Sequence, residues 1–183
     1  IFRDIDRTLT YNQISDLRNF KYPNITYQED PKDTTGTGLI TTILLNPRKK
    51  YTFDASFDAY TSTIQQFGIG FTGGLLIRNV FRGAENLEIS ANGSVGSSKD
   101  NADSNSSFFN TSDVGANVKL TFHRILFPLD TDKFIPKYTS PTTTISAGLN
   151  SQNNIGLDRQ NFNGAFSYQW KPSNIRTNQF DLA

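Results

Sequence analysis

Apolar and polar residues alternate strictly in the segment that begins at Tyr51. Successive side chains of a β-strand point to opposite faces of the sheet, so a strand with this pattern has one apolar face and one polar face. A membrane-spanning strand needs about 9–11 such residues, with its backbone paired on both sides because lipid offers no hydrogen bonds. The apolar positions are Tyr51, Phe53, Ala55, Phe57 and Ala59, and the polar positions between them are Thr52, Asp54, Ser56 and Asp58.

The same alternation recurs along the rest of the chain. Five further segments carry it, and a seventh strand begins at Gln179. The pattern predicts a mostly β fold, namely a partial antiparallel transmembrane β-barrel that holds the first six to seven strands of a larger barrel. The five segments are 67–77, 87–95, 114–122, 143–149 and 162–170.

The composition excludes several other classes of protein. No apolar run approaches the roughly 18 residues that a membrane-spanning helix requires, whereas barrel strands escape hydropathy analysis because half of their residues are polar. A net charge of +1, with 19% charged residues, gives no electrostatic footprint for nucleic acid. The chain contains no Cys, which excludes disulfides and thiol chemistry.

Residues 1–49 differ in character from the alternating segments. Apolar residues at roughly helical spacing predict a helix over residues 3–19. Strands are predicted over 22–27 and 39–45, separated by a polar turn with Pro and Gly. This part of the chain is therefore expected to form a small α/β unit in the water phase. The apolar residues of the helix are Ile5, Leu9, Ile14 and Leu17.

The connections between the predicted strands can be assigned to two sides of a membrane by their order. The segment 97–112 is long and rich in Ser, Asn and Asp, as is typical of an extracellular loop. Aromatic residues lie near the strand ends, which is typical of interfacial girdles. Segments 62–66, 97–112 and 151–160 are expected outside, and segments 79–85, 125–141 and 171–177 on the side of the α/β unit.

No group of side chains in the sequence predicts catalysis, so we expect no enzyme and no cofactor. His123 is the only histidine, and its predicted place at a strand end favours a solvated or hydrogen-bonded role. Asp54 and Asp58 share one face of a strand, where they are more typical of polar lining than of acid–base chemistry. The acidic pairs at 100/103 and 130/132 match no calcium-binding loop, so we expect no metal site.

One segment resembles a known family. The run 77–87, Ile-Arg-Asn-Val-Phe-Arg-Gly-Ala-Glu-Asn-Leu, resembles the first periplasmic turn of the BamA/TamA family of outer-membrane assembly factors. Residues 44–51 are similar to that family's junction between the last POTRA domain and the barrel, and residues 154–172 to its strand five to six region, as in TamA-like members. The residues that carry the turn motif are Arg78, Asn79, Phe81, Arg82 and Gly83.

The resemblance implies a division of the chain and a set of partners. Residues 1–49 would be the C-terminal part of a periplasmic POTRA domain, and residues 50–183 the N-terminal strands of an outer-membrane barrel in a Gram-negative bacterium. The family inserts or exports β-rich clients without a cofactor. The implied partners are the lipid bilayer, unfolded outer-membrane or secreted clients, and periplasmic or lipoprotein accessory subunits, with no nucleic acid.

Two strand edges are the predicted client-binding sites, because an unpaired edge can pair with an incoming strand. We expect the first barrel strand to be the movable side of a lateral gate, although the same residues are equally consistent with an ordinary barrel wall. The gate residues are Tyr51, Phe53, Ala55, Ser56, Phe57 and Ala59. The hairpin of the POTRA part offers Ile25, Tyr27, Leu39 and Ile43.

Two other functions remain open from the sequence. The first is a transport or receptor barrel, such as a porin or an adhesin, and the second is a soluble β-rich protein that binds a ligand. The α/β unit before the barrel favours the assembly function, since porins lack one. The absence of Met, together with a strand that starts near residue 178, predicts that this chain is a piece of a longer protein.

Overall fold

The chain consists almost entirely of β-strands. The computed structural model describes residues 3–34, 38–61, 65–98, 109–128, 135–154, 157–172 and 176–182. Within these ranges it has one α-helix, nine strands and one short 3-10 helix, η1 (Lys137–Thr139). The other elements are α1 (Asp4–Asp16), β1 (Phe20–Glu29), β2 (Leu39–Pro47), β3 (Tyr51–Tyr60), β4 (Gln65–Arg78), β5 (Asn86–Ser98), β6 (Thr111–Phe122), β7 (Thr142–Asn154), β8 (Leu157–Trp170) and β9 (Asn178–Leu182).

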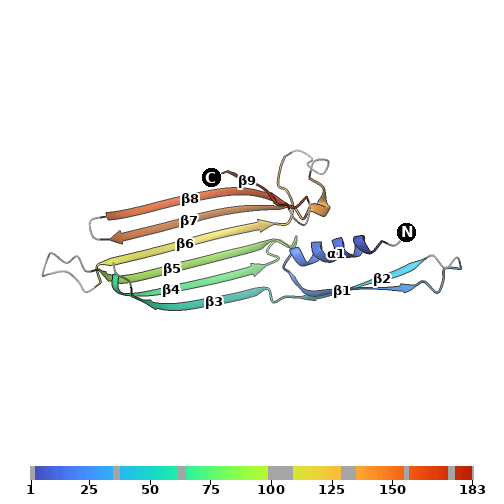
Figure 1. The fold of residues 1–183 in the computed structure, drawn as a ribbon, viewed down its shortest axis with the longest axis horizontal. Helices are drawn as coiled ribbons and strands as arrows, with labels where there is room; N and C mark the ends of the chain where they lie inside the picture. Colours follow the sequence, from blue (N-terminus) through green and yellow to red (C-terminus); the bar gives the residue numbers. More distant parts are fainter. Residues whose placement is uncertain are drawn as a thin grey trace.

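The strands form two separate sheets (Figure 1). β1 and β2 make a two-stranded hairpin, and β3 to β9 make a seven-stranded sheet in which each strand is hydrogen-bonded to its neighbours in the chain. Every pairing is antiparallel. The predicted mostly β fold is confirmed. The seven-stranded sheet is open, with β3 and β9 at its edges, and is not closed into a barrel.

The predicted elements appear close to their expected positions, and most strands are longer than predicted, β7 and β8 by the most. The expected connection 151–160 was assigned wrongly, because β7 continues to Asn154 and β8 begins at Leu157. In this stretch Ser151 pairs with Gln160, and Asn153 pairs with Asp158. Both faces are polar there, so the alternation that marks the other strands is lost although the backbone ladder continues.

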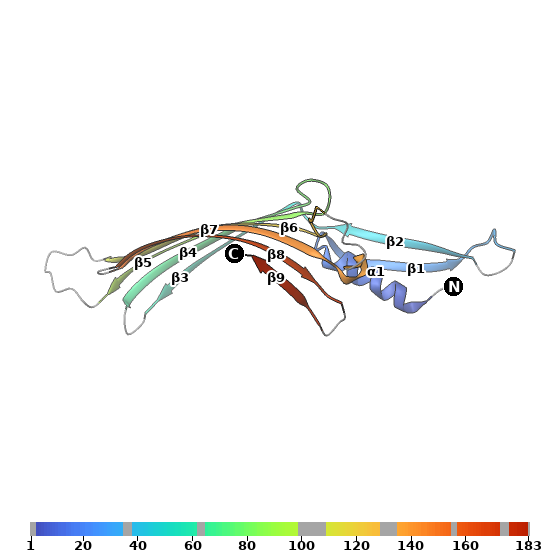
Figure 2. The ribbon, with the colours of Figure 1, turned by 90° about the horizontal axis from the view of Figure 1, so that it is seen from above.

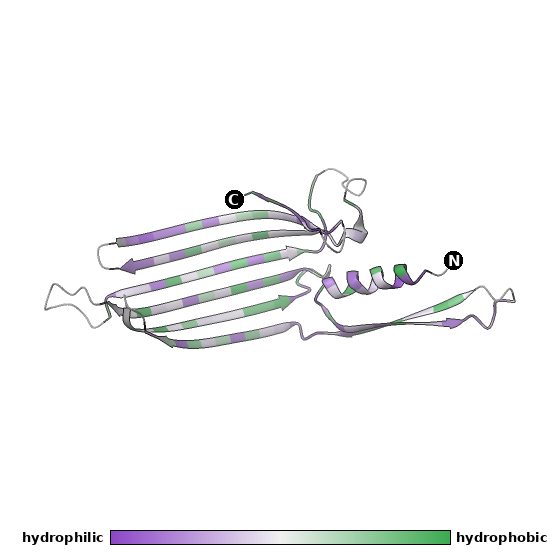
Figure 3. Ribbon diagram, in the orientation of Figure 1, coloured by the Kyte–Doolittle hydropathy of each residue, from purple (hydrophilic) through white to green (hydrophobic). Residues whose placement is uncertain are grey.

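The apolar positions of all seven strands lie on one face of the sheet. Directly paired residues of an antiparallel ladder share a face, and the register joins the apolar positions without a break. The banding in Figure 3 follows this alternation along each strand. One row across the sheet runs through Phe53, Leu75, Ile89, Val118 and Ala147, and the next row runs through Ala55, Gly73, Ala91, Ala116 and Leu149.

The apolar face has no cover in the described part of the chain. No hydrophobic residue there is buried, and the side chains of Phe53, Phe57 and Phe162 are 72%, 69% and 76% exposed. The accessible surface is 13463 Å², whereas a compact globular protein of this mass would expose about 8,800 Å². The apolar side chains therefore need a cover from outside the sheet.

The sheet is curved into an arch, with β3 and β9 at its two lower edges in Figure 2. The C-terminal end of α1 lies on the concave side of this arch. Residues of the polar face, such as Glu88 and Thr144, line a cavity together with Asp16 at that end of α1. The concave face is thus the polar one. No helix within the described ranges is long and apolar enough to cross a membrane.

Candidate functional site

β3 is the edge strand that sequence analysis predicted as a gate. It pairs with β4 alone, and nine of its ten residues are exposed. The hairpin β1–β2, which comes directly before it in the chain, forms its own sheet and leaves the outer edge of β3 uncovered. Five of the six predicted gate residues lie on the apolar face, and Ser56 lies on the polar face.

The partner strand of β3 is rich in glycine. Gly68, Gly70, Gly73 and Gly74 of β4 stand opposite residues of β3. At Gly74 an added Cβ would lie 2.6 Å from the Asp54 Oδ2 atom. At these four positions the contact between the strands consists of the backbone ladder and of side chains that lie over glycines, whereas the other six pairs, such as Phe57 with Phe71, join two side chains. Asp54 is exposed on the polar face, and its position over Gly74 is a detail that the sequence did not predict.

The predicted hairpin residues Ile25, Tyr27, Leu39 and Ile43 lie on one face of the β1–β2 pair. Ile25 pairs with Ile43, and Glu29 pairs with Leu39. Ile25 also lines a groove together with α1 residues, so this face is turned towards α1. All of β2 is exposed, and Leu39 and Ile43 are 44% and 43% exposed. Within the described residues both long edges of the hairpin are without a strand partner.

The turn motif between β4 and β5 holds an unusual backbone conformation. Asn79, Arg82 and Ala84 have φ angles of 55°, 69° and 66°, a region that residues with a Cβ rarely adopt. The Asn79 Oδ1 atom accepts a 3.0 Å hydrogen bond from the Ala84 N–H. The Glu85 carboxylate accepts one of 2.8 Å from the Gly83 N–H. These side-chain contacts stabilise the strained conformation.

Glu85 is the part of this turn that sequence analysis missed. Its side chain is only 4% exposed. Burial by itself would raise the pKa of Glu85, but hydrogen bonds from the backbone N–H groups of Glu85, Gly83 and Phe81, together with the nearby charge of Arg124, lower that pKa overall. Glu85 is therefore ionised at neutral pH and accepts hydrogen bonds within the turn.

The turn motif also joins the α/β unit to the sheet. The Asn19 Nδ2 atom donates a 3.1 Å hydrogen bond to the Ala84 carbonyl, and the Asn86 Nδ2 atom donates one of 3.3 Å to the Leu17 carbonyl. Both Asn residues are buried, with 7% and 6% exposure. Hydrogen bonds have narrow geometry, so these contacts orient α1 and β1 relative to the sheet.

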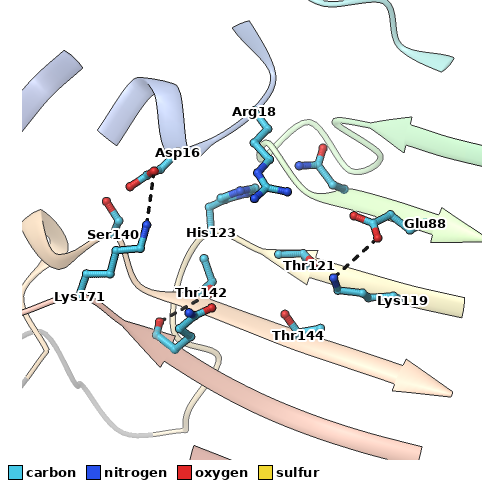
Figure 4. Close-up of a pocket in the computed structure, with 12 residues that line it drawn as sticks. Asp16, Arg18, Glu88, Lys119, Thr121, His123, Ser140, Thr142, Thr144 and Lys171 are labelled. Carbon is cyan, nitrogen blue, oxygen red and sulfur yellow. Dashed lines mark hydrogen bonds and ion pairs between the residues drawn. The ribbon is translucent and has the colours of Figure 1, made fainter. Parts of the chain in front are cut away.

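A polar cavity of 230 Å³ lies between the end of α1 and the concave face of the sheet (Figure 4). Two ion pairs lie among the residues that line it. The Lys171 Nζ atom is 3.7 Å from the Asp16 Oδ1 atom, and the Lys119 Nζ atom is 3.7 Å from the Glu88 Oε2 atom. Each of these side chains is more than a third exposed, so neither pair contributes more than about 1 kcal/mol.

His123 lies in the wall of this cavity, close to Arg18 (Figure 4). Burial lowers its pKa, and the charge of Arg18 lowers it further, while the Ala84 and Asp16 carbonyls and the Asp16 charge act in the opposite direction. Its Nδ1 atom is buried and has no hydrogen-bond partner among the described residues. His123 is therefore a largely neutral side chain between α1 and the sheet, and of the two roles predicted for it the hydrogen-bonded one fits it better than the solvated one.

Nothing in the described ranges assembles a catalytic or metal-binding group. They contain no cluster of three His, Cys, Asp or Glu residues that could hold a metal ion. Asp54 and Asp58 are exposed on β3 and lie opposite Gly74 and Gly70. The acidic pairs at 100/103 and 130/132 lie outside the described residues.

The chain matches no protein-family model, no curated protein and no solved structure.

Proposed function

We propose that this chain is part of an outer-membrane assembly or translocation factor of the BamA/TamA kind. Residues 1–49 would belong to a periplasmic POTRA domain, and residues 50–183 would be the first strands of its transmembrane barrel. The protein would insert or export β-rich clients, which pair with β3 at a lateral gate. It would do so without a cofactor, together with accessory subunits in the periplasm or on lipoproteins.

The apolar face supports a position in the membrane. Its side chains are in register across seven strands, and they are exposed on the convex side of the arch. Exposed apolar surface this continuous is rare on soluble monomers and marks a membrane or a partner. Hydrocarbon tails would cover it without requiring any hydrogen bond, while the ladder pairs the backbone of the inner strands.

The open edge of β3 is the observation that carries the client-binding function. A free edge presents unpaired N–H and C=O groups to which an extended segment can add as a new strand. Four of the ten β4 residues that pair with β3 are glycines, so at those positions β3 is attached through its ladder and not through a pair of side chains. Such a strand can exchange partners at a lower cost than one with interlocked side chains.

The α/β unit favours an assembly factor over a passive transport or receptor barrel. It is joined to the sheet by buried hydrogen bonds at Asn19 and Asn86, which would hold the free hairpin edges next to the barrel entrance. A pore needs only the wall and its polar lining. An extended client could instead contact the hairpin first and then reach β3.

Disulfide cross-linking of two variants, each with one Ala replaced by Cys at a matched position, tests this function. Ala55 and Ala91 lie in the same row of the apolar face, on the edge strand β3 and the inner strand β5. Because the chain has no Cys, Ala55→Cys and Ala91→Cys each introduce a unique thiol. The membrane-embedded variants are mixed, with an added thiol oxidant, with a synthetic peptide that alternates apolar and polar residues and carries one Cys.

The expected result is a mixed disulfide with Ala55→Cys and little or none with Ala91→Cys, since a disulfide requires Cα atoms about 4.4–6.8 Å apart. Equal yields from the two variants would reject strand addition at β3. Cross-links to neither, in a protein that conducts ions through the bilayer, would favour the transport barrel.

A further inference from the structure

A second cavity lies beside the junction between the α/β unit and the sheet, which is formed by the contacts of Asn19 and Asn86. It is located at the start of β3 and the end of β4. Its walls come from the α1–β1 connection, the β2–β3 connection and the β4–β5 turn, and its volume is 530 Å³. None of the described residues that line it is acidic. Four cationic residues contribute to its walls: Arg48, Lys50, Arg78 and Arg82. Lys49 lies between two of them in the sequence.

Two of these cations, Arg48 and Arg78, are held in place by neutral groups. The Arg48 Nε atom donates a 3.1 Å hydrogen bond to the Phe20 carbonyl. The Arg78 Nη1 atom donates to the Lys49 carbonyl at 3.0 Å and to the Thr52 Oγ1 atom at 2.7 Å. None of the four cations forms an ion pair with another described residue. Their positive charge is therefore not neutralised within the described structure.

One of these cations also has an unused hydrogen-bond donor. The Arg78 Nε atom is buried and has no partner among the described residues. A buried donor without a partner costs free energy unless a ligand or water accepts its hydrogen. Together with the uncompensated charge, this donor points to an anionic ligand with oxygen acceptors.

The cavity lies at the border of the apolar face. Tyr51 begins β3 on that face, and the Lys50 Nζ atom is 5.7 Å from the centre of its ring. Phe81, in the turn that lines the cavity, is 63% exposed. Aromatic rings next to Lys and Arg are typical of the level at which lipid head groups lie.

We infer that this basic cavity binds the phosphate group of an anionic phospholipid, in the leaflet on the α1 side of the bilayer. The inference rests on the membrane position proposed above. Lys50, beside the Tyr51 ring, and Arg82 would contact the phosphate oxygens from the rim of the cavity. Arg48 and Arg78, which are held by hydrogen bonds to neutral groups, would add positive charge from within the cavity, and Tyr51 and Phe81 would contact the interfacial part of the acyl chains.

The double variant Lys50→Gln/Arg82→Gln tests this assignment. Neither side chain forms a hydrogen bond or ion pair with a described residue, so the substitutions leave the junction contacts intact. The matched control is Lys32→Gln/Arg159→Gln, which removes the same charge at residues outside the cavity. Each protein is reconstituted into vesicles of phosphatidylcholine mixed with phosphatidylglycerol, and the lipids retained after extraction are identified by native mass spectrometry.

Wild-type and control proteins are expected to retain phosphatidylglycerol in preference to phosphatidylcholine. In the double variant, the ratio of retained phosphatidylglycerol to phosphatidylcholine should fall by about fivefold for each charge removed. Equal retention of the two lipids by the wild type, or an unchanged preference in the double variant, would overturn the inference and leave the proposed function standing. Failure of the wild type to enter either kind of vesicle would overturn both.

A second experiment distinguishes a site for a lipid phosphate from a site for any free anion. Inorganic phosphate is added to the wild-type protein in neutral detergent, before any lipid is present. Weak phosphate binding that phosphatidylglycerol readily displaces would support the lipid. Phosphate binding as tight as that of phosphatidylglycerol would show a general anion site and overturn the lipid assignment.

Discussion

The seven-stranded sheet and its junction with the α/β unit differ in which side chains they expose and which they bury. The apolar residues of the sheet are exposed, whereas Asn19, Glu85 and Asn86 at the junction are buried. Contacts between apolar surfaces are non-directional and accept any apolar cover, while hydrogen bonds require a particular partner in a particular geometry. The apolar face of the sheet is therefore suited to a fluid environment. The junction is suited to holding the α/β unit in one orientation relative to the sheet.

The largest expected effect concerns the apolar face. Val118 and Asn117 are neighbours on β6 that point to opposite faces of the sheet. In a bilayer, Val118→Lys should lower the free energy of unfolding by about 2–4 kcal/mol, because it places a charge in hydrocarbon. Asn117→Lys should have little effect. Urea titration of the vesicle-embedded protein measures both, and equally small effects would show that water covers the face.

The next effect concerns the junction. Glu85→Ala leaves the Gly83 N–H without its acceptor and should lower the free energy of unfolding by about 1–3 kcal/mol. Glu88→Ala, which removes only a partly exposed ion pair with Lys119, should cost no more than about 1 kcal/mol. Unfolding followed by a fluorophore on α1 compares the two variants. A larger loss of stability for Glu88→Ala than for Glu85→Ala would contradict the role of Glu85 in stabilising the turn.

Two Ala→Gly substitutions are expected to change the stability by smaller amounts and in opposite directions. Ala84 has a φ of 66°, where glycine is favoured, so Ala84→Gly should stabilise the turn by roughly 0.5–1 kcal/mol. Ala116 lies within β6, so Ala116→Gly should destabilise the sheet by a similar amount. Thermal unfolding of both variants is the measurement, and destabilisation by Ala84→Gly would contradict the left-handed conformation.

The smallest effect is a pH dependence of the contact between α1 and the sheet. The folded state lowers the pKa of His123, mainly through burial, so the unfolded chain binds more protons below its ordinary pKa of about 6.5. Stability should therefore fall as the pH drops through about 6.5 towards the lowered value. The charged residues that line the same cavity are Asp16, Arg18, Glu88, Lys119 and Lys171.

Amide hydrogen exchange of α1 between pH 7.5 and 5 measures this change, and His123→Gln is the control because it removes the only histidine. Exchange in the wild type should accelerate as the pH falls, after correction for the intrinsic rate. The same acceleration in His123→Gln would assign the effect to another group.

The sequence alone was sufficient for the strands, their faces and the helix, because a period of two and a helical spacing are local properties of the backbone. That β3 is an edge strand was also predictable from its place in the chain order. Its role as a gate, and the POTRA and membrane assignments, remain proposals.

Only the tertiary structure revealed the junction and the extent of β7 and β8. Asn19 meets the Ala84 carbonyl across 65 positions of sequence, and Asn86 meets the Leu17 carbonyl across 69. No local pattern distinguishes these Asn residues from exposed ones. The polar pairs between 151 and 160 are strand because the neighbouring ladder continues, although no alternation marks them. The periodicity of the sequence predicts on which face of a strand a side chain lies. Its burial, and the pairing of its strand, depend on residues that are distant in sequence.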